Sequence, residues 1–278
     1  MRDVAHGIRW TGVSPHQALR DDDANADWPR MHVTVDPGPA PPAAAVVDGQ
    51  RVRHELADGR HVLVMDRATS RATLHGSALD DDSLVHPYLG PIAAIASRWR
   101  GRESFHAGLV AGAQGAWMVL GDKEAGKSTL LAALHRAGHL VLSDDLVMVD
   151  GRDALAGPRT LDLREPPAGP LAGLSGRAVR EGQRWRIALP DAPSRWALSG
   201  WLRLGWGAQR TVSLLPASQR LRALAAWRGA GMLDSDPRVL LELASLPGYV
   251  LERPRGWQLD ADVAEVARLT AGGATPSA

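Results

Sequence analysis

Residues 118–145 read MVLGDKEAGKSTLLAALHRAGHLVLSDD, and we expect the rest of the chain to be organised around this stretch. Inside it, residues 121–128 match the phosphate-loop pattern G-x-x-x-x-G-K-[ST]. The apolar residues 117–120 that precede the loop are typical of a buried parallel strand. Residues 128–137 follow it with leucines at helical spacing, and Gly138 is placed to end that helix. The order of strand, glycine loop and helix predicts a site for the phosphates of a nucleotide.

The residue types in the loop explain how it would hold phosphate. Gly121 and Gly126 allow the backbone to curl so that successive N–H groups point inward, at the positive end of a helix dipole. Lys127 is placed to reach the β- and γ-phosphates, and the Ser128 hydroxyl to bind Mg²⁺, so ATP and Mg²⁺ are the expected cofactors. A chance match among 29 glycines is the alternative, and the flanking patterns disfavour it. The expected nucleotide contacts are Gly121, Asp122, Lys123, Glu124, Ala125, Gly126, Lys127, Ser128 and Thr129.

Two adjacent carboxylates follow the next apolar run. Residues 140–142 are typical of a strand, and Asp144 and Asp145 stand at its end, Asp144 only 144 − 128 = 16 residues after Ser128. That spacing leaves room for one helix and one strand, so we expect the acidic pair on a neighbouring strand beside the loop. One aspartate could hold Mg²⁺ while the other accepts a proton from an attacking hydroxyl. The alternative is a polar strand end in which one residue caps a turn.

The same residues carry a resemblance to a known family. Residues 105–110, FHAGLV, then the loop, a helix ending in R-x-G, and a strand ending in S-D-D resemble the HPr kinase/phosphorylase-related family. The resemblance is strong over residues 105–150 and weaker over residues 198–250. It implies an α/β fold with a P-loop nucleotide-binding core of HPr kinase/PEP carboxykinase type, next to a β-rich N-terminal part.

The resemblance also implies roles for single residues. A histidine at the position of His106 sits near the γ-phosphate in HPr kinase-like proteins, whereas the residues alone favour an ordinary strand-end histidine. We expect Asp144, His106 and Lys127 to be catalytic, and Ser128 and Asp145 to bind the metal. Arg159 and Arg164 are further candidates for steadying the triphosphate, or else are ordinary surface arginines.

The chain departs from the family at one place. HPr kinases proper have a glutamate-bearing E-I-R-G-L-G segment after the aspartates, and this chain lacks it. The departure argues against a true HPr kinase/phosphorylase and puts the phosphorylase half of that activity in doubt.

The domain organisation follows from the N-terminal pattern. Short strands are expected at residues 31–35, 45–47, 52–56, 61–66 and 71–76, paired antiparallel because their connections are short. A helix is expected over residues 84–99. We therefore expect a β-rich region over residues 1–97 and a P-loop catalytic domain over residues 98–278.

Composition limits the class of protein. The formal net charge of +1 argues against a nucleic-acid or membrane partner recruited by bulk charge. The absence of cysteine excludes disulfides and thiol catalysis. The sequence shows neither a signal peptide nor an apolar run of membrane-spanning length, so a cytoplasmic location is expected.

Three functions fit these patterns. The first is an ATP- and Mg²⁺-dependent kinase acting on a serine hydroxyl of a protein or peptide. Relatives with such a reduced pattern include kinases of lasso-peptide precursors, so a ribosomal precursor peptide is one expected acceptor. The second is a nucleotide-binding regulatory or assembly protein without turnover, and the third is a small-molecule kinase. Family members often form homo-oligomers, which the residues themselves do not test.

Overall fold

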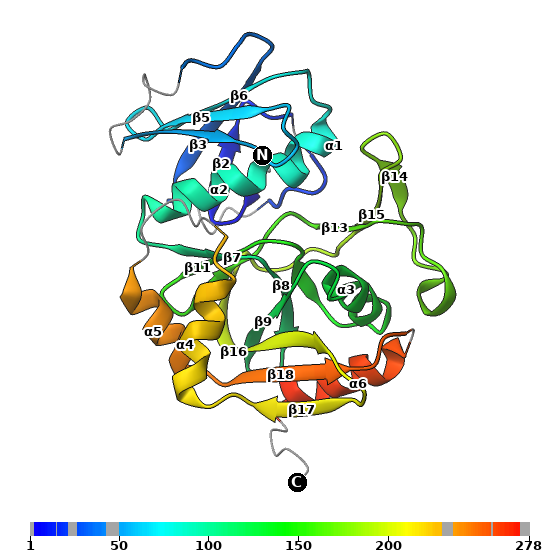
Figure 1. The fold of residues 1–278 in the computed structure, drawn as a ribbon. Helices are drawn as coiled ribbons and strands as arrows, with labels where there is room; N and C mark the ends of the chain where they lie inside the picture. Colours follow the sequence, from blue (N-terminus) through cyan, green and yellow to red (C-terminus); the bar gives the residue numbers. More distant parts are fainter. Residues whose placement is uncertain are drawn as a thin grey trace.

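A computed structural model describes residues 3–14, 16–21, 27–42, 50–229, 236–256 and 258–272. These residues form a mixed α/β fold in which an N-terminal sheet lies beside a larger sheet that carries the loop (Figure 1). A smaller, three-stranded sheet projects from the larger part. No helix in the described ranges is both long and apolar enough to cross a membrane.

The N-terminal sheet is mixed, which corrects the expected antiparallel pairing. Its strands are ordered β1-β2-β3-β6-β5-β4, and both β2–β3 and β3–β6 pair in parallel. Long connections separate these parallel partners in sequence, which gives the chain room to cross over. The expected strand at 45–47 lies outside the described residues. The strands are Val4–Ala5 (β1), Ile8–Thr11 (β2), Arg30–Asp36 (β3), Arg51–Glu55 (β4), Val62–Asp66 (β5) and Arg71–His75 (β6).

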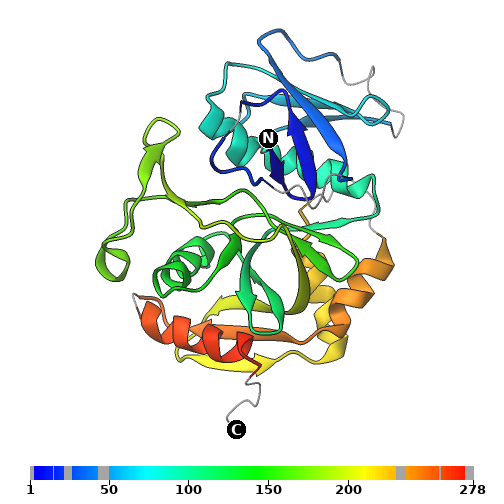
Figure 2. The ribbon, with the colours of Figure 1, turned by 180° about the vertical axis from the view of Figure 1, so that it is seen from behind.

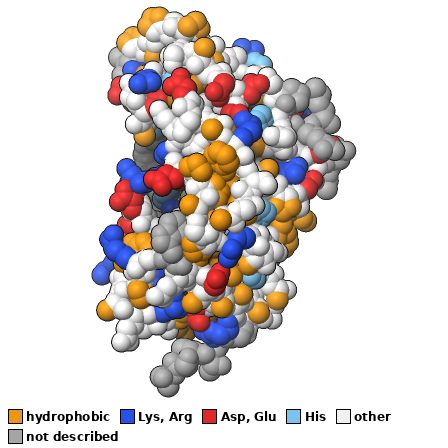
Figure 3. All heavy atoms as spheres, turned by 90° about the vertical axis from the view of Figure 1, so that its right-hand side faces the viewer, with side chains coloured by type: hydrophobic (Ala, Val, Ile, Leu, Met, Phe, Trp, Pro, Cys, Tyr) orange, Lys and Arg blue, Asp and Glu red, His pale blue; other side chains and the backbone are white. Residues whose placement is uncertain are grey.

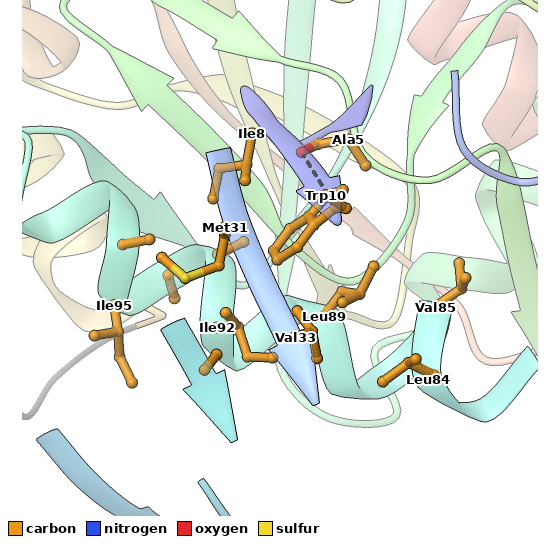
Figure 4. Packing of buried hydrophobic residues seen from close by; sticks show 14 of the residues in the cluster. Ala5, Ile8, Trp10, Met31, Val33, Leu84, Val85, Leu89, Ile92 and Ile95 are labelled. Atoms are coloured by element: carbon orange, nitrogen blue, oxygen red, sulfur yellow. Dashed lines mark hydrogen bonds between the residues drawn. The ribbon is translucent and has the colours of Figure 1, made fainter. Parts of the chain in front are cut away.

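The helix expected over residues 84–99 is divided. Asp81–Ser83 (α1) and the π-helical segment Leu84–Tyr88 precede Leu89–Arg98 (α2). His86 has an extended backbone, because the ring of a following proline disfavours the helical conformation. The apolar stripe is nevertheless buried: Leu89, Ile92 and Ile95 pack against the N-terminal sheet, with Trp10 at the centre of the contact (Figure 4).

The larger sheet is built around one long strand, Arg195–Trp206 (β16). The order is β10-β8-β9-β16-β12-β11-β7, and β18 and then β17 continue from the second half of β16. The loop strand β9 pairs in parallel with β16 and antiparallel with β8. The other strands are Glu103–Phe105 (β7), Ala107–Gly112 (β8), Gly115–Gly121 (β9), Val141–Ser143 (β10), Val147–Asp150 (β11), Asp153–Leu155 (β12), Thr211–Leu214 (β17) and Gly248–Arg253 (β18).

One expectation about this sheet needs correction. The acidic strand β10 is not the immediate neighbour of β9, because β8 lies between them and pairs antiparallel with both. Two antiparallel steps restore the direction, so β10 and β9 run the same way and end at the same edge of the sheet. The aspartates therefore still reach the loop.

Helices cover both faces of the larger sheet. Lys127–Arg136 (α3) and Leu259–Thr270 (α6) lie on one side, and Ala217–Ala226 (α4) and Pro237–Ser245 (α5) on the other (Figures 1 and 2). Side chains alternate accordingly along β9: Trp117 and Val119 join the core under α3, whereas Met118 and Leu120 join the core under α4 and α5. The sheet is thus buried on both faces, as its apolar strands predict.

The third sheet consists of Thr160–Leu163 (β13), Arg177–Val179 (β14) and Arg184–Ala188 (β15), ordered β13-β15-β14. On the face of the molecule that these strands border, cationic and anionic side chains are interspersed (Figure 3). This face shows no broad field of one charge.

The proposed boundary near residue 98 stays a prediction. Helix α2 shares its core with the N-terminal sheet, and Met148 and Leu155 of the larger part also belong to that core. The buried Arg20 donates hydrogen bonds to three carbonyl oxygens of the larger part, at Leu142, Gly157 and Ala192. The N-terminal part is therefore joined closely to the edge where β10 ends.

Candidate active site

The glycine loop connects the end of β9 with the start of α3. Gly126 has a left-handed backbone, with φ 76°, and immediately precedes the first residue of the helix. The backbone conformation favours glycine, and a Cβ at this position would also lie 2.9 Å from a guanidinium nitrogen of Arg253, which would have to shift. Ala125 is buried, whereas Asp122, Lys123 and Glu124 are exposed. The loop therefore leads into a helix N-terminus of the kind that binds anions.

Lys127 folds back over the loop. Its side chain is 7% exposed, and Nζ donates to the carbonyl oxygen of Gly121 at 3.3 Å. Burial lowers the pKa of Lys127, while the carboxylates of Asp145, Asp144 and Asp122 oppose this. The ammonium group thus sits where phosphate oxygens would replace a weak carbonyl contact.

The ring of His106 links Lys127 to Asp145. His106 lies between β7 and β8; its Nε2 is 3.1 Å from Lys127 Nζ, and its Nδ1 is 3.2 Å from a carboxylate oxygen of Asp145. An ammonium group only donates, which assigns the ring hydrogen to Nδ1, facing the carboxylate. Burial lowers the pKa of His106, Lys127 adds to this effect, and Asp145 opposes it. We infer that the imidazole ring of His106 is neutral and that it orients the carboxylate of Asp145.

The other carboxylate, Asp144, contacts the helix that follows the glycine loop. Ser128 Oγ donates to it at 3.1 Å, and the backbone N–H of Asp162 lies 3.4 Å from its second oxygen. Burial first, and then the charge of Asp145, raise the pKa of Asp144 to about 7. The adjacent Asp145 is half-exposed and has a left-handed backbone, with φ 69°. Such local strain is concentrated at functional sites.

The residues present fit Mg²⁺ held together with a nucleotide. Ser128 and Asp144 offer hard oxygen ligands, and Mg²⁺ takes one or two carboxylates and completes its shell with phosphates and water. Within the described ranges there is no cluster of three or more histidine, aspartate or glutamate side chains that could hold a metal by itself. The donor set therefore suits a metal that arrives with the triphosphate.

The two candidate arginines are placed differently. Arg164 lies beside the loop, with Nη1 3.1 Å from a carboxylate oxygen of Glu124, and both side chains are exposed. Arg159 donates instead to the carbonyl oxygen of Leu189 and lines a separate cavity with Arg177. The contacts thus place Arg164, but not Arg159, next to the loop.

A cavity of about 200 Å³ opens beside both aspartates. Its far wall comes from the N-terminal part: His6 between β1 and β2, His54 on β4, and His86 before α2. Burial lowers the pKa of all three imidazoles, that of His6 to about 3. Among the described residues that line the cavity there is no lysine or arginine. The acidic side chains among these described residues are Asp144 and Asp145.

No sequence pattern pointed to these three histidines. They are single residues far apart in the chain, and none belongs to a motif. A buried ion pair between Asp162 and Arg186 was also missed; the guanidinium contacts both carboxylate oxygens at 2.7 Å. Asp162 in turn touches Asp144, so this pair continues the site into the third sheet.

Comparisons with known proteins add little to this geometry. No family model matches the chain, and no curated protein matches it. Among solved structures, the chain is similar to the Hpr(Ser) kinase/phosphatase from Coxiella burnetii, with 10% identity and a TM-score of 0.30, over 59% of this chain and 93% of that one. A similarity at this level assigns neither the fold nor the activity, which have to be deduced from the site itself.

Proposed function

We propose that the chain is a phosphotransferase that moves the γ-phosphoryl group of ATP, with Mg²⁺, to a hydroxyl group held in the cavity beside the aspartates. The main support for this proposal is the way five side chains are grouped. Ser128 with Asp144, and Lys127 with His106 and Asp145, converge at one edge of the sheet, and both aspartates line the cavity. A phosphate site and a second-substrate site are thereby joined through the two carboxylates.

The nucleotide side uses the loop. Backbone N–H groups of residues 121–128 would hold the phosphates, and Lys127, which donates to the Gly121 carbonyl in this structure, would contact the β- and γ-phosphates instead. Mg²⁺ when bound neutralises charge that develops on the phosphate oxygens. Because phosphoryl transfer needs little covalent help, the contribution of the protein is positioning and charge.

The two aspartates divide the work according to their neighbours. Asp144 shares a hydrogen bond with Ser128, which is the metal-binding position of such loops, so Asp144 is assigned to the metal side. Asp145 is oriented by the neutral ring of His106 and faces the cavity, so it accepts the proton of the attacking hydroxyl. This assignment is the reverse of the sequence-based prediction, in which Asp145 held the metal and Asp144 was the base.

The cavity indicates the kind of acceptor. Its two carboxylates and neutral imidazoles disfavour an anionic molecule and favour a neutral or cationic alcohol. A cavity of about 150 Å³ holds benzene, so this one has room for a serine side chain with its adjoining backbone. A serine of a protein or precursor peptide with non-acidic neighbours therefore fits.

A small-molecule kinase is the second candidate, favoured by the same volume. A compact neutral polyol or amino alcohol would fill the cavity as well as a serine side chain does. The two candidates share the chemistry and differ in the acceptor.

Incubation with γ-labelled ATP and Mg²⁺ separates them. The protein is supplied in parallel with host lysate, with co-encoded peptides, and with a protein-free metabolite extract. Label on a polypeptide that is strongly reduced with Asp145→Asn supports the peptide or protein kinase. Label on a metabolite supports the second candidate, and tight ATP binding without transfer to any acceptor contradicts both and leaves a nucleotide-binding regulator.

A further inference from the structure

Trp206 stands at the edge of the sheet on the other side of the loop from the aspartates. It is the last residue of β16, two positions beyond the pairing of Leu204 with Gly121, so the strand extends past the point where the loop begins. The ring is partly exposed, and a Cβ on Gly126 would lie 3.6 Å from its six-membered ring. An aromatic ring thus borders the phosphate loop.

A buried arginine fixes that ring. Trp206 pairs with Arg253 on β18, and the Arg253 guanidinium lies 4.4 Å from the ring centroid. Arg253 is 2% exposed; it donates to the Ala125 carbonyl of the loop at 2.7 Å and to Asp262 at 3.0 Å. Ring and loop are therefore held by one cation, and the position of the ring is set relative to the phosphates.

Two further donors lie at this ring. Arg253 Nη1 is buried and has no hydrogen-bond partner among the described residues, which is uncommon for a buried donor. The exposed Arg255 has its guanidinium 5.5 Å from the ring centroid. Donors grouped at a partly exposed ring suit a flat heterocycle that carries acceptor atoms.

The strand order gives the direction in which a nucleotide would lie. The order β10-β8-β9-β16 puts Asp144 and Asp145 on one flank of the loop strand and Trp206 on the other. In the proposed function the γ-phosphate faces the aspartates, so the nucleoside end of the triphosphate points to the opposite flank. The carboxyl ends of β9, β16 and β18 meet there, which is where parallel sheets bind ligands.

We propose that Trp206 is the platform on which the nucleobase stacks, with Arg255 beside it, and that this contact makes the site prefer a nucleotide over bare polyphosphate. The proposal rests on the proposed function, because it takes the loop as the phosphate site. Stacking of a base on an aromatic side chain changes affinity by about tenfold or more.

Equilibrium binding of Mg-ATP and of inorganic tripolyphosphate to the full chain tests the platform. Trp206→Ala is expected to weaken ATP binding about tenfold and to leave tripolyphosphate binding unchanged, and Trp206→Phe to restore most of the ATP affinity. Trp196→Ala, at the start of the same strand, is the matched control and should change neither affinity. The retained tripolyphosphate binding shows that the variant is folded and that its loop is intact.

Two kinds of result would contradict the proposed role of Trp206 and leave the proposed phosphotransferase function intact. One is a wild-type protein that binds tripolyphosphate as tightly as ATP. The other is a Trp206→Ala variant that loses both ligands equally or neither. A wild-type protein that binds neither ligand would overturn the proposed function, and the platform with it.

Discussion

The phosphate side and the acceptor side of the site are built in different ways. The phosphate side comes from one continuous run, residues 105–145, in which neighbours in sequence are neighbours in space. The wall of the acceptor cavity comes from His6, His54 and His86, which meet only because the N-terminal part lies against the edge of β10. The nucleotide and the acceptor should therefore respond to different substitutions.

The largest effect is expected on the phosphate side. Lys127→Ala removes the ammonium group that faces the β- and γ-phosphates, and should slow transfer by about 1,000-fold because one charged donor to the transition state is lost. The measurement is the rate of label transfer at saturating Mg-ATP. Arg136→Ala, which removes a cation at the opposite end of α3, is the control and should remain near the wild-type rate. Equal effects of the two would break the assignment of Lys127.

Asp144 and Asp145 lie where the phosphate side meets the acceptor side, so their variants test how the two sides differ. Asp144→Asn should raise the Mg²⁺ concentration for half-maximal rate by at least about tenfold, since Asp144 stands with Ser128. Asp145→Asn should instead lower the maximal rate about 100-fold at unchanged Mg²⁺ dependence, because it removes the proton acceptor. Magnesium titrations of both variants measure this. The opposite pattern would restore the sequence-based assignment.

A substitution in the cavity wall tests whether acceptor binding can be changed without changing nucleotide binding. Ala94→Leu places a larger side chain on the α2 wall and should raise the acceptor KM about tenfold while Mg-ATP affinity stays unchanged. Ala94 is 4% exposed, so melting temperature is followed to confirm that the variant is folded. A parallel loss of ATP affinity in a folded variant would show that the sides are not independent.

The smallest effect concerns stability in metal-free solution. Because the folded-state pKa of Asp144 is raised to about 7, the native state binds more protons than the unfolded chain between about pH 4 and pH 7, and its stability falls as pH rises through that window. Asp144→Asn removes this cost and should stabilise the protein at pH 8 by about 1 kcal/mol, or roughly 2–4 °C in melting temperature. At pH 4 the two proteins should melt together. Thermal melts with chelator check this, and a destabilised variant at pH 8 would contradict the raised pKa.

The phosphate side of the site could be predicted from the sequence, whereas the acceptor side could not. The helix expected over residues 128–137 is found at Lys127–Arg136, and the nearness of the acidic pair to the loop follows from its spacing alone. The spacing did not reveal that β8 lies between the two strands, because strand order depends on contacts that no local pattern encodes. Arg159 was singled out for its charge, yet its position is set by Leu189 on a distant segment. The parallel pairing of β3 with β6 and the cavity wall depend likewise on how remote segments meet.

The most direct test of the phosphotransferase is γ-label transfer to the acceptor by three proteins in parallel: wild type, Asp145→Asn and Asp260→Asn. Asp260 is an aspartate on the surface of α6 and serves as the charge-matched control. We predict equal transfer by wild type and Asp260→Asn, and transfer slower by about 100-fold by Asp145→Asn with ATP binding retained. Transfer by Asp145→Asn at the wild-type rate would contradict the account, because the hydroxyl would then lose its proton without the carboxylate that lies between His106 and the cavity.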